Sequence, residues 1–254
     1  MPRRSAAVFL FLLAALSTPA AWIEKDSRSE SSSAPSLIHR HVVLEDSDSG
    51  ESANLELALF SPKSCQLRVI DNPDGTSSLA EAMPAAKCLA GVNGGYFDPN
   101  FAPLGLRVVD GKMTARLVRG RLLSGVLIFS DNSVQIVRAG EFSKKLKPSA
   151  ALECGPFLVD RGHRVAGLEA TRAARRTFAA IGSGDRAALG YCSEVSLAEL
   201  SDILSGGIGD FKVQRALNLD GGSSSAFWFK GKDGSVFSIP EQKAVRDFVG
   251  VSSR

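Results

Sequence analysis

The sequence predicts an α+β fold: a single domain in which one or more mixed, largely antiparallel sheets carry a few flanking helices. Three observations predict it. Short turn sequences, among them Asp110-Gly111 and Asp131-Asn132, separate apolar runs as in β-hairpins. Several runs alternate apolar and polar residues with the period of a half-buried strand. Two capping boxes, beginning at Ser78 and Ser196, each open a short helix.

Strand signals dominate the first half of the chain. Around residues 55–59, leucines alternate with polar or small residues, which is typical of a strand with one buried face. Residues 71–75, Asp-Asn-Pro-Asp-Gly, have the chemistry of a turn. The helix after Ser78 is expected to end before Pro84, because proline disfavours a helical conformation in the residue before it. Strands are expected over residues 38–44, 55–59, 66–70, 89–92, 104–109, 113–117, 125–129 and 133–137.

The second half mixes strands with one longer helix. The helix from Ser196 is amphipathic, continues through about Leu204, and is stopped by Gly206-Gly207. Strands are expected over residues 152–159, 177–181, 187–191, 216–219 and 226–230. No internal repeat or second linker divides the chain, and 254 residues suit one large domain. That domain is expected to span residues 37–254.

Residues 1–21 have the pattern of a secretory signal peptide. Arg3 and Arg4 form the basic region, residues 6–16 the apolar run, and residues 18–21 a cleavage zone of small residues. The apolar run is shorter than the roughly 20 residues of a membrane span. An uncleaved anchor is the alternative, and no stable membrane span is expected. The protein is therefore expected to be exported, either periplasmic or secreted, with residues 22–36 as a disordered, Ser-rich lead-in.

The charge balance argues against a nucleic-acid partner. The chain carries 30 Lys+Arg and 27 Asp+Glu, a net charge of +3. Without Arg3 and Arg4, 28 cations remain against the same 27 anions, so the net charge falls to +1. Capture of nucleic acid usually needs a strong basic face. The sequence does not indicate the oligomeric state.

No cofactor and no metal are assigned from the sequence. No nucleotide-cofactor motif is present. His39-x-His41 could present two imidazoles on one strand face, but no third ligand follows with a zinc spacing. Asp98-x-Asn100 could offer oxygen ligands to calcium, but two ligands do not make a site.

The four cysteines are expected to pair in an oxidising compartment. None has CxxC spacing, which argues against a zinc ribbon or a thioredoxin motif. The favoured pairs are Cys65–Cys88 and Cys154–Cys192, because their members are sequential and lie in strand-like surroundings. The alternative is that one or both pairs stay as buried free thiols.

Two glycine-rich segments follow predicted strands. In the first, residues 93–98, Gly94 and Gly95 let the backbone turn sharply and approach a ligand, while Asn93 and Asp98 offer polar groups. An ordinary turn followed by aromatic core residues is the alternative. In the second segment, residues 218–225, the strand period places Asn218 and Asp220 on the same side.

The glycines and serines after Asp220 form a cradle suited to a phosphate, or else a hairpin loop whose Asp caps its own backbone. The run Gly222-Ser-Ser-Ser-Ala226 nearly matches the elbow of serine hydrolases around Ser224. That elbow must open a helix, whereas residues 226–229, Ala-Phe-Trp-Phe, predict a strand. A serine hydrolase using Ser224 is therefore the weakest function considered.

A third segment carries Arg172, Arg175 and Arg176 into the strand at 177–181. Arginine suits bidentate binding of phosphate, although a solvated basic loop is the more common outcome for such a cluster.

Four segments in order resemble the phosphodiester glycosidase family: NGGYFD at 93–98, CGPFLVDRGH at 154–163, RRTFAAIG at 175–182, and ALNLDGGSSS at 216–225. The resemblance spans about residues 38–230. Two positions depart from the family pattern: Ser223 stands where a glycine or proline follows LDGG, and Tyr96 stands where Phe is frequent. The resemblance implies a site where the NGG loop, the arginine of RRT and the LDGG loop converge.

The chemistry of these residues agrees with that implication. A phosphate leaving group needs less acid assistance than an alkoxide, so one carboxylate could serve as general base or as stabiliser of the sugar cation. Asp220 is the expected carboxylate, Glu153 and Asp98 are the reserves, and Asn93 would orient sugar or water. The expected catalytic residues are Asp220, Asn93 and Glu153. The expected substrate-binding residues are Gly94, Gly95, Asp98, Arg175, Arg176, Asn218, Gly221, Gly222, Ser223 and Ser224.

The expected function is an exported hydrolase that cleaves a glycosyl phosphodiester or a related glycan of the cell envelope or exopolysaccharide. Its partner would be a carbohydrate or sugar-phosphate substrate. The alternative is a non-catalytic periplasmic or secreted protein of envelope assembly that binds a glycan phosphate in the same pocket. The low histidine count and the lack of a recognisable triad or metal motif keep that alternative open.

Overall fold

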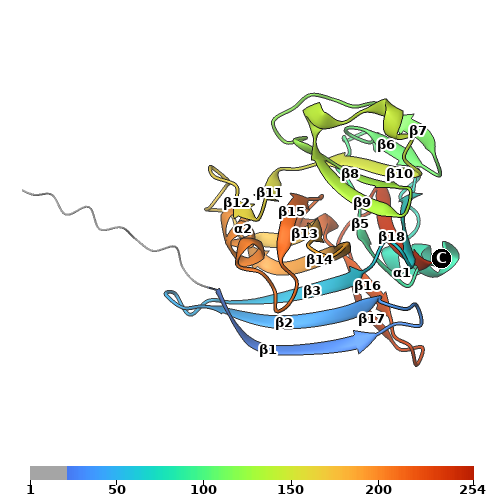
Figure 1. Cartoon of the computed structure of the whole chain (residues 1–254). Helices are drawn as coiled ribbons and strands as arrows, with labels where there is room; N and C mark the ends of the chain where they lie inside the picture. Colours follow the sequence, from blue (N-terminus) through green and yellow to red (C-terminus); the bar gives the residue numbers. More distant parts are fainter. Residues whose placement is uncertain (1–21) are drawn as a thin grey trace, which may run out of the picture.

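A computed structural model describes residues 22–254. The predicted signal peptide, residues 1–21, lies outside the described residues. The described residues form three sheets (Figure 1), and side chains from all three share one core. Each strand pair in residues 22–254 is antiparallel, as largely predicted. Strands dominate, and this part of the chain has two α-helices, so the helical share of the expected α+β fold is small. Neither helix is long and apolar enough to cross a membrane.

The largest sheet has eight strands. Its long strands β1 to β3 lie along one edge of the molecule (Figure 1). In spatial order the strands are β1 (Trp22–Ser31), β2 (Ile38–Asp46), β3 (Ser52–Phe60), β14 (Arg186–Val195), β13 (Ala174–Gly182), β15 (Val213–Asn218), β11 (Phe157–Asp160) and β12 (His163–Arg164).

Strand β1 corrects the prediction that residues 22–36 are a disordered lead-in. It pairs with β2 from Trp22 opposite Asp46 to Ser31 opposite Ile38. Nearly all its side chains are exposed, so no alternation of apolar residues marks it as a strand. The backbone ladder to β2 and the packing of Trp22 at the rim of the core hold it. Its charged side chains suit an unpaired sheet edge.

The second sheet has five strands, and the predicted turns at Asp110-Gly111 and Asp131-Asn132 both form hairpins in it. All four turn residues have positive φ, between 45° and 78°, as a two-residue hairpin of type I′ requires. In spatial order the strands are β7 (Lys112–Ala115), β6 (Arg107–Val109), β10 (Ala150–Cys154), β8 (Gly125–Ser130) and β9 (Ser133–Arg138). The 3-10 turns η1 (Ala139–Glu141) and η2 (Lys144–Leu146) follow β9.

The third sheet also has five strands and includes the last strand of the chain. In spatial order they are β17 (Val236–Ile239), β16 (Phe227–Lys230), β5 (Ala90–Asn93), β18 (Asp247–Ser253) and β4 (Cys65–Asp71). Because β5 is central, the segment that follows it starts from the middle of this sheet.

Both predicted capping boxes are confirmed. Helix α1 (Leu79–Ala85) is capped by Ser78 with Glu81, and α2 (Leu197–Gly206) by Ser196 with Glu199. The end of α1 was predicted wrongly, because Pro84 lies inside its last turn. In so short a helix the proline removes only one backbone donor. Helix α1 packs on the outer face of the third sheet, and α2 on the outer face of the eight-stranded sheet.

The single strand predicted over residues 152–159 is two strands in different sheets. Strand β10 ends at Cys154 in the second sheet, and β11 begins at Phe157 in the eight-stranded sheet. A cis peptide bond joins Gly155 and Pro156 between them. Both halves are apolar because both face buried surfaces, so hydrophobicity alone does not reveal the break.

The predicted disulfides are not formed: the four cysteines are free and buried. Cys65 lies in the central core, whereas Cys88 packs with α1 across the third sheet. Cys154 lies in the central core, whereas Cys192 faces α2 across the eight-stranded sheet. A sheet therefore separates the members of each predicted pair. Burial raises the pKa of the Cys88 thiol to about 11 and that of Cys192 to about 12.

Candidate active site

Asn93, the last residue of β5, joins the three segments that the sequence singled out. Its Nδ2 donates to the carbonyl oxygen of Asp220 over 2.7 Å. Its Oδ1 accepts from the Thr177 hydroxyl over 2.7 Å and from the Ala226 N–H over 3.1 Å. The side chain has no solvent exposure. The NGG loop, the strand that contains Arg175 and Arg176, and the LDGG loop thus converge on one buried amide.

The NGG loop is held from behind by Asp247, which the sequence analysis did not single out. The Gly94 N–H donates to the Asp247 carbonyl oxygen and the Gly95 N–H to Asp247 Oδ1, both over 2.8 Å. A Cβ at Gly94 would collide with the Asp247 carboxylate, so only glycine fits there. Burial raises the pKa of Asp247 to about 6, against the opposing effects of the Gly95 N–H and Arg107.

Arg107 connects this carboxylate to Asp71, the last residue of β4. Its Nη1 lies 2.7 Å from Asp71 Oδ1 and 3.4 Å from Asp247 Oδ2. Arg246 also contacts the Asp71 carboxylate. The buried Asp247, the exposed Asp71 and two buried arginines form a fixed base beneath the NGG loop. Asp247 therefore positions the loop.

Asp220 lies at the turn after β15, beside the NGG loop. Its N–H donates to the Gly94 carbonyl oxygen over 3.1 Å, and its Oδ1 accepts from the Gly221 N–H over 3.0 Å. The side chain is half-buried. Burial raises its pKa, and the Ser224 hydroxyl, the Lys243 ammonium and the Gly221 N–H oppose that rise. Asp220 is thus a partly accessible carboxylate with a raised pKa at the meeting point of the loops.

The backbone after Asp220 turns tightly. Gly222 has a φ of +64° and begins the 3-10 turn η3 (Gly222–Ser224). Within residues 22–254, the N–H groups of Gly222 and Ser223 find no acceptor. The Ser223 carbonyl oxygen accepts from the Gln242 N–H over 2.7 Å, which ties the loop to the segment after β17.

Tyr96 and Asn218 form a short polar chain at the other side of the junction. The Tyr96 hydroxyl donates to the Gly155 carbonyl oxygen over 2.7 Å. Asn218 Nδ2 donates to the Tyr96 oxygen over 3.0 Å and to the Gly155 carbonyl over 3.2 Å. Burial raises the pKa of Tyr96, so its phenol stays neutral. Asn218 Oδ1 is buried without a partner among the described residues.

The two arginines of β13 have different surroundings. Arg175 Nη2 donates to the carbonyl oxygens of Ser225 and Pro240, over 2.5 and 2.8 Å, so it braces the LDGG loop. Arg176 is buried, and its Nε and Nη2 donate to the carbonyl oxygens of Val195 and Arg172. Arg176 Nη1 points toward the LDGG loop, 4.0 Å from where a Cβ on Gly221 would lie.

Lys243 adds a second cation that sequence reasoning missed. It is exposed, its Nζ lies 5.3 Å from the centroid of the Phe97 ring, and its charge opposes the rise that burial causes in the pKa of Asp220. The lysine stands in the loop before β18, and only the fold brings that loop beside the LDGG segment.

The reserve carboxylates serve local structure. Glu153 has no solvent exposure, and its Oε2 accepts from the N–H groups of Leu106 and Val118 over 2.7 and 2.9 Å. Asp98 Oδ1 accepts from the N–H groups of Asn100 and Ala102, both over 2.9 Å, so it caps its own turn. Both carboxylates accept from backbone N–H groups nearby, whereas Asp220 lies where the NGG and LDGG loops meet.

The structure also shows the surroundings of Ser224 and of the pair His39 and His41. Ser224 is fully buried in η3, and a strand follows it, so the elbow of a serine hydrolase is not formed. His39 and His41 lie on one face of β2, as expected. There they flank the Glu56 carboxylate at 2.7 and 2.8 Å.

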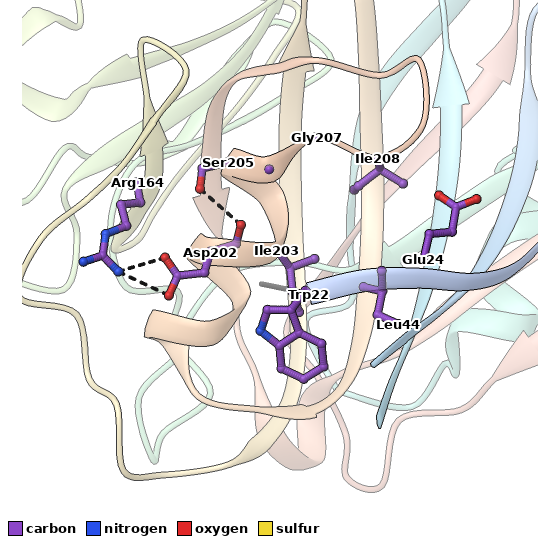
Figure 2. A pocket seen from close by; sticks show the side chains of 10 residues that line it. Trp22, Glu24, Leu44, Arg164, Asp202, Ile203, Ser205, Gly207 and Ile208 are labelled. Carbon is purple, nitrogen blue, oxygen red and sulfur yellow. Dashed lines mark hydrogen bonds and ion pairs between the residues drawn. The ribbon is translucent and has the colours of Figure 1, made fainter. Parts of the chain in front are cut away.

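The cavity drawn in Figure 2 is a different place in the molecule. It has a volume of about 370 Å³ and lies between the start of β1 and the end of α2, near Trp22 and Ile208. Arg164 and Asp202 form an ion pair of 2.9 Å at its rim. It shares no residue with the Asp220 cluster.

Fold and site together define a class: antiparallel sheets whose glycine- and arginine-containing segments enclose a carboxylate beside cations. A sequence model of the phosphodiester glycosidase family matches residues 86–252, well over half of the chain. The chain belongs to the phosphodiester glycosidase family. No curated protein matches it in sequence.

Solved structures share the fold at low identity. The catalytic domain of zebrafish N-acetylglucosamine-1-phosphodiester alpha-N-acetylglucosaminidase, auto-inhibited by its pro-peptide, aligns with a TM-score of 0.69 and 17% identity, over 91% of this chain and 89% of its own. A hypothetical protein from Synechocystis aligns with a TM-score of 0.58 and 15% identity, over 86% of this chain and 62% of its own. A Burkholderia pseudomallei K96243 protein described as exported aligns with a TM-score of 0.58 and 14% identity, over 80% of this chain and 74% of its own.

Proposed function

We propose that the protein is an exported hydrolase that cleaves the bond between a sugar and the phosphate of a glycosyl phosphodiester. The observation that supports this most strongly is the convergence of the three segments on Asn93, which places Asp220 beside Arg176 and Lys243. In this proposal residues 1–21 are the export signal and the domain begins with β1 at Trp22.

The phosphate of the substrate would lie over the LDGG turn. Arg176 Nη1 and the Lys243 ammonium supply positive charge there, and the N–H groups of Gly222 and Ser223 supply donors. Arg175 does not contact phosphate in this arrangement, because its Nη2 already binds two backbone carbonyl oxygens. Arg175 instead holds the LDGG loop in place, and that loop binds the phosphate.

Asp220 would provide the carboxylate for the chemistry. Its ionised form takes a proton from the attacking water or stabilises the developing sugar cation. The water oxygen forms a bond to the anomeric carbon, the bond from that carbon to the phosphate oxygen breaks, and the phosphomonoester leaves with the electron pair. A phosphomonoester is a weak base, so this departure does not need a second carboxylic acid. That agrees with the structural tasks of Glu153 and Asp98.

Tyr96 and Asn218 would shape the sugar side of the pocket. The neutral phenol and the amide are linked through the Gly155 carbonyl. Asn218 is itself buried, and its Nδ2 fixes the position of the Tyr96 phenol. We assign both residues to substrate positioning and neither to proton transfer.

The test is hydrolysis of a nitrophenyl-type glycosyl phosphodiester, with release of phosphomonoester followed by phosphorus NMR. Asp220→Asn should abolish turnover while the protein stays folded. Asp98→Asn is the matched control, since it makes the same chemical change in a carboxylate that caps its own turn. Turnover by Asp220→Asn at the wild-type rate would overturn the assignment. Tight binding of the intact diester without turnover by the wild type would favour the glycan-phosphate-binding alternative.

A further inference from the structure

The loop between β7 and β8, residues 116–124, combines exposed cations with exposed apolar side chains. Arg116, Arg119 and Arg121 are exposed, and none of them forms an ion pair within residues 22–254. Val118 and Leu122 lie between them, with 47% and 66% of their surface exposed. The loop has no role in the catalytic proposal above. Its composition therefore needs a separate explanation.

Exposed apolar residues gather around this loop. Within residues 22–254, seven large hydrophobic side chains are exposed, and four of them lie between positions 104 and 122. Besides the two in the loop, these are Leu104, 45% exposed, and Met113, 39% exposed. A cavity of about 400 Å³, lined by Leu117, Leu123 and others, opens beside the loop. Such gathering marks an interaction surface.

Positive charge is concentrated in the same part of the chain. Residues 112–147 contain eight Lys or Arg and two Asp or Glu, a net charge of +6. The whole chain has a net charge of +3, so the rest of it is net negative, at −3. All these residues belong to the second sheet and its loops, at the end of the molecule away from β1 (Figure 1).

We propose that this face, the outer loops of the second sheet with residues 116–124 at its centre, binds the surface of an anionic lipid bilayer. Cations alone would suit any polyanion, and apolar side chains alone would suit any apolar surface. A bilayer with anionic headgroups offers phosphates to the three arginines and an apolar layer just beneath for Leu122 and Val118. The partner follows from this match of charge and apolarity.

The face adjoins the candidate active site. The Val118 N–H donates to Glu153 Oε2 over 2.9 Å. The Leu122 carbonyl oxygen packs so closely on Gly155 that a Cβ there would collide with it. The Gly155 carbonyl in turn accepts from Tyr96 and Asn218. Docking would hold the site next to the bilayer, and, if the proposed function holds, would select lipid-linked glycosyl phosphodiesters as substrates.

The test is binding to vesicles of phosphatidylglycerol in phosphatidylcholine, compared with phosphatidylcholine alone. The protein is expressed as the full-length chain and purified after export, so all variants share one N-terminus. We expect binding to anionic vesicles only. The triple variant Arg116→Gln, Arg119→Gln, Arg121→Gln should bind about 100-fold more weakly, because each cation at such a surface contributes about fivefold. The control variant Arg28→Gln, Lys230→Gln, Lys232→Gln removes the same charge from the opposite end and should bind like the wild type.

Leu122→Ser separates a bilayer from a soluble polyanion. It should weaken vesicle binding and leave binding of soluble polyphosphate unchanged. Equal vesicle binding by wild type and the arginine variant, or no loss with Leu122→Ser, would overturn the proposal. Hydrolysis of a soluble diester should be the same in the arginine variant and the wild type. If the wild type binds vesicles but hydrolyses no diester, the proposed function fails and the docking surface stands.

Discussion

Replacing Asn93 with alanine should remove the hydrogen bonds that hold the NGG loop, strand β13 and the LDGG loop together. The change removes three hydrogen bonds of 2.7, 2.7 and 3.1 Å from a fully buried position. It leaves the Thr177 hydroxyl, the Ala226 N–H and the Asp220 carbonyl without their partner. Each buried group left unpaired costs about 1–3 kcal/mol, and water or small shifts recover part of that. We expect a loss of about 3–6 kcal/mol in the free energy of unfolding, against a total of about 5–15 kcal/mol for a domain.

Asn72→Ala is the matched control for this experiment. Asn72 is also a buried asparagine with three hydrogen bonds, to Ser77 twice and to Val245, but it lies in the turn after β4. Urea unfolding followed by tryptophan fluorescence should show losses of similar size in both variants. Hydrolysis by the folded fraction should fall sharply only with Asn93→Ala, because only that variant frees the Asp220 loop.

Thr177→Val keeps the experiment informative if Asn93→Ala fails to fold. It removes only the hydrogen bond between Thr177 and Asn93, so the expected loss is about 1 kcal/mol and the protein stays folded. A loss below about 1 kcal/mol for Asn93→Ala would refute the reasoning. Equal loss of activity in Asn93→Ala and Asn72→Ala would also refute it.

Three further predictions follow from the site and the core. Gly94→Ala should lower the free energy of unfolding in urea by at least about 2 kcal/mol, because the new Cβ would collide with the Asp247 carboxylate. Gly95→Ala should lower it less, because its Cβ would lie 3.2 Å from the nearest side-chain atom. The reverse order would contradict the close fit at Gly94. Folding raises the pKa of Asp247 from 3.8 to about 6, so the folded state holds this proton more tightly and its contribution to stability falls as pH rises between those values. The free energy of unfolding of the wild type should fall by up to about 3 kcal/mol across that pH range, and that of Asp247→Asn should not. Identical slopes of this free energy against pH in the two proteins would contradict the prediction. Thiol titration of the denatured protein without reductant should find four thiols per chain, and two or none would mean that disulfides form.

Local chemistry allowed the sequence to predict most elements. The hairpins at Asp110-Gly111 and Asp131-Asn132 and the caps at Ser78 and Ser196 depend on neighbouring residues only, and all four form. The convergence of the three segments was implied by family resemblance and not by spacing. The structure supplies its physical basis, which is the Asn93 side chain.

What the sequence did not reveal depends on contacts between distant segments. Strand β1 is held by its ladder to β2, a property of the backbone that side chains do not display. Asp247 lies in an apolar strand 152 residues after Gly95, and no local pattern connects the two. Lys243 becomes part of the site only because β16 and β17 return the chain to the LDGG turn. The predicted cysteine pairs were wrong because sequence order does not show which face of a sheet a residue occupies.

The most direct test of the central claim is hydrolysis of a glycosyl phosphodiester in water enriched in oxygen-18. If Asp220 directs water to the anomeric carbon, the label enters the released sugar, and the phosphorus resonance of the phosphomonoester shows no isotope shift. Attack of water at phosphorus would instead put the label in the phosphate and shift that resonance. The first result is the one predicted from the Asp220 site, and the second would contradict a glycosidase mechanism.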